Sequence, residues 1–491
     1  MSFGRTTRYM IATALVLTAV PPSGLTAATA AASSASAISA RDKSQGAQAN
    51  PQLIAEYGGA ITGPQADYVA SIGKKVALQS GLSNSSNDFT VTLLDSSINN
   101  AFAIPGGYIY TTRQLVELMN NEAELGGVLG HETAHVALRH SAKRQNNATK
   151  NQIVGILGAV LSGVFLGNSQ IGQLLQQGFS QGSQLATLSF SRKQESEADS
   201  YGIKYLRGAG YDPRAMSTVL QSLANQNALD SRLVGNNVQV PEWASTHPDP
   251  ASRVRTAAAL AGPNATGVTN RDTFLSRISG LIYGDSPAQG YAEGRTFKHP
   301  IYKLAFEAPA GFYLINGTQA VAIGGQSGKG QFTTAAFDGN LDNYVAAQFA
   351  TLGQANQAQL NPTAIQHTTI NGIPAAYSTA RVSSGNSQVD VTVFAYQWSS
   401  SQAYHFLTIT QAGQNPFDSM FGSVRRLTDA QAGALKPRRL QVVTVKASDT
   451  LQSLASRMAY TDAPLERFLV LNGLTASSRL NTGQKVKLVT Y

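Results

Sequence analysis

Residues 121–140 read NEAELGGVLGHETAHVALRH, and this stretch decides how the first half of the chain is organised. An Asn followed three residues later by a Glu, ahead of an apolar pattern, predicts the start of a helix. His131 and His135 are four residues apart and therefore share a face of that helix, so both imidazoles can reach one cation. Glu132 follows the first of them and can accept a proton from water bound to that cation. The alternative is a helix that carries two surface histidines by coincidence.

A third ligand has to come from elsewhere, because a catalytic metal usually has three protein ligands and one open position. The chain has no Cys, which leaves His and carboxylates as donors. The best candidate is Glu195 in the segment 191–199, SRKQESEAD, whose first residues again predict a helix start. Asp199 lies one turn further on the same face, where it can accept the second ring N–H of a ligand histidine. The alternative for this segment is an exposed, charged helix.

The N-terminus has the layout of an export signal. Residues 1–30 contain Arg5 and Arg8, then an apolar run, then small residues, which is typical of a cleavable signal peptide. The apolar run is shorter than the about 20 residues that a membrane span needs. The lack of Cys excludes a lipid-modified cysteine and a disulfide framework, which suits a periplasm better than a small extracellular scaffold. We therefore predict a periplasmic protein secreted through a signal peptide, with a flexible leader at 31–50.

Length and charge limit the remaining possibilities. A chain of 491 residues is too long for one ordinary core. Its formal charge of +9, or +7 without the two arginines of the signal, is a mild basic excess that suits an anionic envelope surface and gives no reason to expect nucleic acid as a partner. We expect a multidomain α+β protein with four parts after the leader: a mainly helical metal domain with a small sheet at 51–262, a linker at 263–296, a sheet-rich domain of unassigned role at 297–428, and a small module at 436–491.

Residues 153–167 form an almost wholly apolar stretch with a small residue at every fourth position. On a helix these small residues make one smooth stripe that allows close approach of a second helix. The stretch therefore predicts a packed hairpin with 171–185 beside the metal site. The alternative is peripheral contact with, or insertion into, a membrane, although the stretch is short for a span.

Four groups of residues together resemble the zinc metallopeptidases of the HtpX and CAAX prenyl endopeptidase type, and most closely their periplasmic BepA-like branch. The resemblance covers about residues 51–262. The four groups are NAFAIPGG at 100–107, HETAHVALRH at 131–140, SRKQESEAD at 191–199 and STHPDPASR at 245–253. The resemblance implies a helical gluzincin fold with one Zn²⁺ per chain, for which the ligands are His131, His135 and Glu195, the base is Glu132, and Asp199 stands behind a ligand.

The resemblance also implies how a substrate binds. The segment 100–107 is expected to lead into an edge strand along which an extended chain pairs through its backbone, which tolerates many side chains. Its expected substrate-binding residues are Asn100, Ala101, Phe102, Pro105 and Gly106, although an ordinary loop would have the same Gly and Pro. His247 and Arg253 are expected near the zinc, either in regulation or in stabilising the transition state, where a cation can face the developing oxyanion.

Residues 442–489 resemble a LysM module in the order strand, helix, helix, strand. Such modules bind glycans that contain N-acetylglucosamine, so the resemblance implies peptidoglycan as a partner. Ala447 and Ser448 depart from the usual turn of these modules, and the alternative is a degenerate module used only for protein contacts. The arrangement also departs from the BepA-like proteins, which carry helical repeats after the protease domain.

These features together predict a zinc metalloendopeptidase of the cell envelope, associated with the cell wall or the outer membrane. Its expected substrates are unfolded, misassembled or stalled periplasmic and outer-membrane proteins. The alternative is a wall-bound chaperone or assembly factor with little or latent proteolytic activity. An intact base and three ligands favour the enzyme, because a pure scaffold needs none of them.

Overall fold

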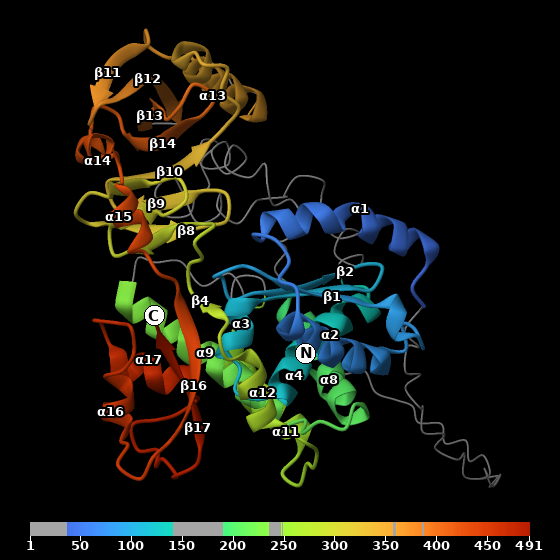
Figure 1. Cartoon of the computed structure of the whole chain (residues 1–491). Coiled ribbons are helices and arrows are strands. Elements are labelled where there is room, and N and C mark those ends of the chain that lie inside the picture. The colour runs from blue at the N-terminus through green and yellow to red at the C-terminus, as the bar shows by residue number, and fades with distance from the viewer. Residues whose placement is uncertain (1–36, 141–189, 235–246, 248, 357–359, 385–386) are drawn as a thin grey trace, which may run out of the picture. The chain divides into compact units, whose positions relative to one another are not determined.

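A computed structural model describes residues 37–140, 190–234, 247, 249–356, 360–384 and 387–491 (Figure 1). The predicted signal peptide and the predicted hairpin at 153–185 lie outside these residues. Within the described part of the chain, no helix has the length and apolar character needed to cross a membrane. The expected multidomain α+β architecture is confirmed, with a helical metal domain, a sheet-rich region and a small βααβ module.

The metal domain contains a three-stranded sheet in the order β1-β3-β2, formed by β1 (Thr90–Leu94), β3 (Tyr108–Thr112) and β2 (Ala101–Ile104). β3 is parallel to β1 and antiparallel to β2, so β2 is an edge strand among the strands that the structure describes. Gly106 and Gly107 connect β2 to β3 with φ angles of 96° and 85°, which residues with a Cβ rarely adopt. The segment 100–107 therefore folds as an edge strand followed by a tight turn.

Helices cover both faces of this sheet. α1 (Ala40–Glu56) lies on one face, and α2 (Pro64–Ala77) and α4 (Glu122–Ala137) lie on the other (Figure 1). Leu53 and Tyr57, at the end of α1, pack in a small buried cluster with Leu94 and Tyr110 of the sheet. The larger core lies on the opposite face, between the sheet and the helices that carry the metal site.

The N-terminal helix α1 differs from the sequence expectation. A flexible leader was expected at 31–50, but residues 40–50 belong to this helix. Ser39 and Asp42 form a reciprocal capping box that starts the helix. Gly46 lies so close to the β2–β3 turn that an added Cβ would be 2.3 Å from the carbonyl oxygen of Pro105. Gly46 thus allows a close contact with the turn, and Ala49 and Asn50 add contacts with the sheet, Asn50 by accepting from the hydroxyl of Tyr110 at 2.7 Å.

Helices α3 (Arg113–Leu118), α8 (Arg192–Gly208), α9 (Ala215–Val234), α11 (Pro250–Ala261) and α12 (Arg271–Ile278) complete the metal domain. α8 packs against α4 at Gly202, where an added Cβ would lie 3.1 Å from the backbone nitrogen of His131. The glycine thus lets the two helices approach closely enough for residues of α8 to reach the histidines of α4. Such a contact leaves little room for either helix to shift.

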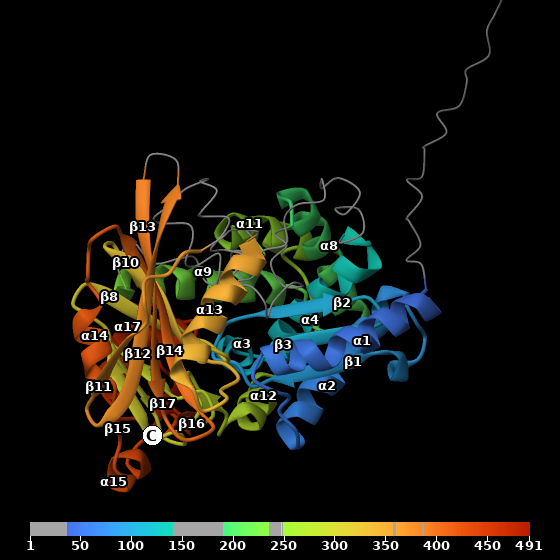
Figure 2. The same ribbon diagram turned by 90° about the horizontal axis from the view of Figure 1, so that it is seen from above.

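The sheet-rich region contains an antiparallel sheet of seven described strands, with α13 (Leu341–Asn356) along one face (Figure 2). Neighbouring residues of one strand point to opposite faces, so Leu407 packs beneath α13 while Phe406 joins an aromatic cluster on the other face. In spatial order the strands are β11 (Gln366–Ile370), β12 (Ile373–Ser384), β13 (Ser387–Gln397), β14 (Ala403–Gln411), β10 (Gly328–Thr334), β9 (Val321–Gly325) and β8 (Phe312–Asn316).

The strands of a second antiparallel sheet come from the segments that precede and follow the seven-stranded sheet in the sequence. This second sheet comprises β15 (Arg425–Arg426), β7 (Leu304–Glu307), β6 (Thr296–His299) and β5 (Tyr291–Glu293), and two short helices follow the seven-stranded sheet, α14 (Asp418–Ser423) and α15 (Asp429–Gly433). The aromatic cluster includes Phe297 and Phe306 of this second sheet, so the two sheets share a core.

The C-terminal module has the predicted order β16 (Arg438–Thr444), α16 (Leu451–Ala455), α17 (Pro464–Leu471), β17 (Lys485–Thr490). Its sheet has a third strand, β4 (Ile282–Tyr283), which comes from the predicted linker and pairs with β16. The segment 263–296 also contains α12 and β5, so it is folded over much of its length. One continuous hydrophobic cluster includes residues of the module and residues of the metal domain.

Candidate metal centre

The metal helix α4 begins at the predicted cap. The backbone N–H of Glu124 donates to the side chain of Asn121 at 2.9 Å, and the Glu124 carboxylate accepts from the backbone of Asn120 at 2.7 Å. His131 and His135 lie on one face of this helix, both buried, and their Nε2 atoms are 3.0 Å apart. The sequence spacing therefore brings two imidazole nitrogens to one point.

Helix α8 brings Glu195 to the same point. Ser191 and Gln194 form a capping box at its start, and Glu195 follows in the first turn. Its fully buried carboxylate lies 3.3 Å from His135 Nε2 and 3.5 Å from His131 Nε2. Burial raises the pKa of this carboxyl, but the neighbouring histidines His247, His131 and His135 outweigh burial and hold it well below its usual range.

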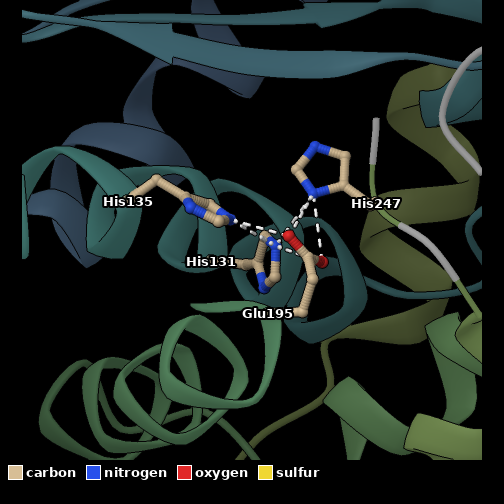
Figure 3. Close-up of side chains that lie close together, drawn as sticks. All are labelled: His131, His135, Glu195 and His247. Atoms are coloured by element: carbon tan, nitrogen blue, oxygen red, sulfur yellow. Dashed lines mark hydrogen bonds and ion pairs between the residues drawn. The ribbon is translucent and has the colours of Figure 1, made fainter. Parts of the chain in front are cut away.

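His247 is the fourth member of the cluster (Figure 3). Its Nδ1 lies 3.1 Å from Glu195 Oε1 and 3.3 Å from His131 Nε2, and its ring is buried. The four donor atoms of His131, His135, Glu195 and His247 all lie within 4.8 Å of one another. The structure thus brings together the three expected ligands and His247, which was expected near them.

This donor set fits a metal ion. Three imidazoles and one carboxylate converge, and nitrogen and oxygen donors of this kind suit Zn²⁺. Burial alone lowers the pKa of His131, but hydrogen bonds with Asp199 and Glu195 raise it to about 9, so the site favours positive charge.

Asp199 and Arg253 lie behind the donors. His131 Nδ1 is 2.9 Å from Asp199 Oδ1, which leaves Nε2 of this ring facing the cluster. The buried guanidinium of Arg253 donates to Asp199 at 2.8 Å and 2.5 Å and to Glu195 at 2.6 Å. Burial raises the pKa of Asp199, but the bonds from Arg253 and His131 lower it overall. The guanidinium therefore fixes the positions of both carboxylates by hydrogen bonds.

Sequence reasoning missed a second support, behind His135. His140 Nδ1 lies 2.9 Å from His135 Nδ1, and His140 Nε2 lies 3.2 Å from Glu197, whose side chain is 41% exposed. Phe190 also stacks on His135, with ring centroids 3.8 Å apart. A spacing of five residues is no regular helical pair, so the sequence pattern gave no signal for the His135–His140 contact.

Glu132 differs from the other acids of the site. It is buried, and its Oε1 has no hydrogen-bond partner among the described residues. The ring nitrogen Nε2 of His247 lies 3.4 Å from this oxygen. Burial raises the pKa of this carboxyl, while His247 and His131 oppose that shift. A buried acid whose oxygen accepts no hydrogen bond from the described residues, beside a cluster of candidate metal ligands, is placed to exchange a proton with water.

The predicted substrate residues at 100–107 lie on and beside the edge strand β2. The side chain of Asn100 is buried and donates to the hydroxyl of Tyr57 at 3.0 Å. Phe102 stacks on Tyr110, with centroids 4.6 Å apart. Ala101 and Gly106 are buried and Pro105 is exposed. The side chains of Asn100 and Phe102 thus hold the strand in place, and the backbone edge is the part that can pair with another chain.

A helix with paired histidines and an adjoining glutamate, completed by a glutamate from a second helix, has the donor set of the HExxH metallopeptidases. Residues 64–261 match the family model Peptidase family M48, and residues 443–489 match the model LysM domain. By these matches the metal domain is similar to peptidase family M48, and the C-terminal module is similar to LysM domains.

Curated relatives resemble the metal domain. The "Beta-barrel assembly-enhancing protease" of Yersinia pestis is 34% identical over 225 residues, which is 44% of this chain and 44% of that protein. The protein of that name from Escherichia coli (strain K12) is 33% identical over 39% of this chain and 37% of its own length. "Metalloprotease LoiP" of the same organism is 35% identical over 26% and 47%. The chain thus spans less than half the length of these relatives.

Proposed function

We propose that this protein is a zinc-dependent endopeptidase of the cell envelope. The proposal is carried by the convergence of His131, His135 and Glu195 beside the buried Glu132, whose Oε1 accepts no hydrogen bond from the described residues. Zinc held by these three ligands would supply a Lewis acid and lower the pKa of a bound water. Glu132 would accept a proton from that water and return it to the amine of the cleaved peptide bond.

His247 regulates this site in the proposal. A catalytic metal needs one position open to water and substrate, and the Nδ1 of His247 lies where it can serve as a fourth donor. The site is therefore latent while His247 remains in place, and it opens when this ring moves away. Arg253 acts as a positioning residue, because its guanidinium bonds Asp199 and Glu195.

The substrate class follows from the edge strand and from the relatives. The backbone of β2 can pair with an extended polypeptide, which favours unfolded segments of many sequences. Relatives of the metal domain are called beta-barrel assembly-enhancing proteases. We therefore propose misfolded or stalled envelope proteins as substrates, in a periplasmic location, with peptidoglycan as the partner of the LysM domain.

The test compares the wild-type chain with Glu132→Gln, which keeps the size of the side chain and removes its basicity. Cleavage of unfolded casein and of an unfolded outer-membrane barrel protein is followed, and zinc content is measured by mass spectrometry. We expect roughly 10²-fold or greater loss of cleavage, the usual contribution of a general base, with unchanged zinc. Equal zinc and equal inactivity in both proteins would contradict the enzyme proposal.

The four-donor cluster also favours one alternative, a chaperone or assembly factor with a latent protease. His247→Ala separates the two functions. An enzyme regulated by His247 gains cleavage activity in this variant, whereas a scaffold gains none and keeps its effect on barrel assembly in Glu132→Gln. Retention on insoluble peptidoglycan, with and without residues 436–491, tests the wall contact, and unchanged retention would exclude the LysM domain as the anchor.

A further inference from the structure

The last strand of the LysM domain places a lysine inside the metal domain. Lys487 of β17 is 0% exposed. Its ammonium group donates to three successive backbone carbonyls, those of Glu117 at 2.8 Å, Leu118 at 3.1 Å and Met119 at 2.7 Å. These carbonyls form the end of α3, immediately before the cap of the metal helix α4. One side chain of the module thus binds the junction from which the metal helix starts.

The backbone of this lysine is also fixed. The N–H of Lys487 donates to the side-chain oxygen of Asn472 at 2.7 Å, and the amide of Asn472 donates back to the carbonyl of Lys487 at 2.9 Å. Asn472 follows α17 and is itself buried, so a helix of the module holds the strand at the level of the contact. The ammonium group therefore has a defined position relative to the LysM core.

Burying the ammonium group of Lys487 costs free energy unless hydrogen bonds replace the water that it has lost. The carbonyls at a helix C-terminus carry partial negative charge, which favours a cation at that position. Burial lowers the pKa of Lys487 to about 7, although the nearby carboxyls Glu124 and Glu117 oppose that shift. The three bonds offset part of this cost. Removing the ammonium group takes a donor from each carbonyl, and only that of Leu118 has a second recorded side-chain donor, the amide of Asn120 at 3.3 Å.

The junction is mechanically connected to the metal ligands. Glu124, in the first turn of α4, accepts from the backbone of Asn120 and from the hydroxyl of Thr218 on α9. His131 and His135 lie further along the same uninterrupted helix, where Gly202 of α8 packs against the backbone of His131. A tightly packed helix transmits a shift at its start because its neighbours cannot fill the resulting gaps.

We propose that Lys487 is a positioning residue for the metal site, and that the LysM domain is a structural part of the protease domain that sets the zinc affinity of His131, His135 and Glu195. This inference rests on the proposed zinc site. The module and the metal domain share one hydrophobic cluster, which provides the rest of the connection. The LysM domain is therefore docked against the metal domain and supports α4, in addition to its proposed contact with peptidoglycan.

The experiment measures zinc affinity in the full-length chain by competition with a chromophoric chelator. Lys487→Met removes the charge and keeps the length of the side chain, and Lys487→Arg restores a cationic donor. Leu454→Ala is the matched control, because Leu454 is fully buried in α16 of the same module and its loss weakens the LysM core. We expect roughly 3- to 30-fold weaker zinc binding in Lys487→Met, partial recovery in Lys487→Arg, and wild-type affinity in the control.

Two outcomes would overturn the inference: wild-type zinc affinity in folded Lys487→Met, or an equal loss of affinity in Leu454→Ala, which would indicate general destabilisation. A wild-type chain that does not bind zinc contradicts the proposed function itself. Hydrogen exchange of the wild-type chain supplies a readout that needs no variant. Zinc is expected to slow exchange at 485–490 more than at 451–455, and equal or absent protection of 485–490 argues against the coupling.

Discussion

Two regions of this molecule bury histidines in opposite ways. In the metal centre, His131 lies within 3.5 Å of two other imidazoles and two carboxylates. In the sheet-rich region, His405 is equally buried, and its recorded polar contact is the hydroxyl of Tyr344 at 2.9 Å. Burial lowers the pKa of His405 to about 4, whereas the carboxylates raise that of His131 to about 9. Convergent charged partners, and not burial alone, distinguish a site from a core.

The largest expected effect tests this distinction directly. His131→Ala removes a donor from the centre of the cluster, so we expect zinc content to fall from about one ion per chain to near zero, with loss of proteolysis. The matched variant His405→Ala removes an imidazole of similar burial and is expected to keep its zinc. Mass spectrometry of the purified proteins measures both contents. Equal zinc in the two variants would remove the difference between the regions.

The second prediction concerns acid stability of the sheet-rich region. Burial in the folded protein lowers the pKa of His405 to about 4, below its ordinary value of 6.5. The unfolded chain therefore binds the proton first as pH falls, and the free energy of unfolding decreases between pH 6.5 and pH 4, by about 3 kcal/mol. His405→Gln is expected to flatten this dependence. Urea unfolding at pH 4.5 and pH 7, followed by the fluorescence of Trp398, provides the measurement, and parallel curves for both proteins would contradict it.

The carboxylate of Asp199, which contacts His131, is expected to affect the zinc affinity of the site. Asp199→Asn weakens the acceptor for His131 Nδ1, so we expect zinc affinity to fall roughly 10- to 100-fold, as for other residues that support metal ligands. Asp390→Asn is the matched control, because Asp390 also pairs with an arginine, Arg381, but in the sheet-rich region. Chelator competition distinguishes the two, and a similar change in both would indicate a non-specific effect.

The smallest effect is expected at His140. This ring contacts His135 from behind but has a partly exposed partner in Glu197, so solvent can replace part of the support. His140→Gln is expected to weaken zinc binding less than Asp199→Asn, by less than roughly tenfold. The same chelator competition measures it. A loss larger than that of Asp199→Asn would show that the support of His135 is the more important one.

Local periodicity explains which parts of the site could be predicted from the sequence. The helix repeat places His131 with His135, and Glu195 with Asp199, and the structure has both pairs on single helices. The role of His140 could not be inferred in this way, because it depends on Arg139, whose φ of 55° turns the chain back at the end of α4. This backbone conformation is uncommon for residues other than glycine and leaves no pattern in the sequence.

The fold was predictable to a similar degree. The mainly helical metal domain with a small sheet follows from residue patterns, and the order of the LysM elements follows from the resemblance to such modules; both appear in the structure. The docking of the module was not predictable. Lys487 lies 370 residues from Glu117, and its sequence neighbours indicate only an ordinary strand. Contacts between distant segments depend on tertiary packing, which single-sequence periodicity does not report.

The separation of 370 residues between Glu117 and Lys487 also orders events in time. Ribosomes add about 5–20 residues per second, so the metal helix exists for roughly 20–70 s before the strand that supports its junction has been made. During that interval the emerging chain has its histidines but lacks the contact that fixes them. If Lys487 supports the metal site as proposed, zinc binding would reach its full strength only after β17 has been made, so the proposed proteolytic activity would stay low while the chain is still emerging.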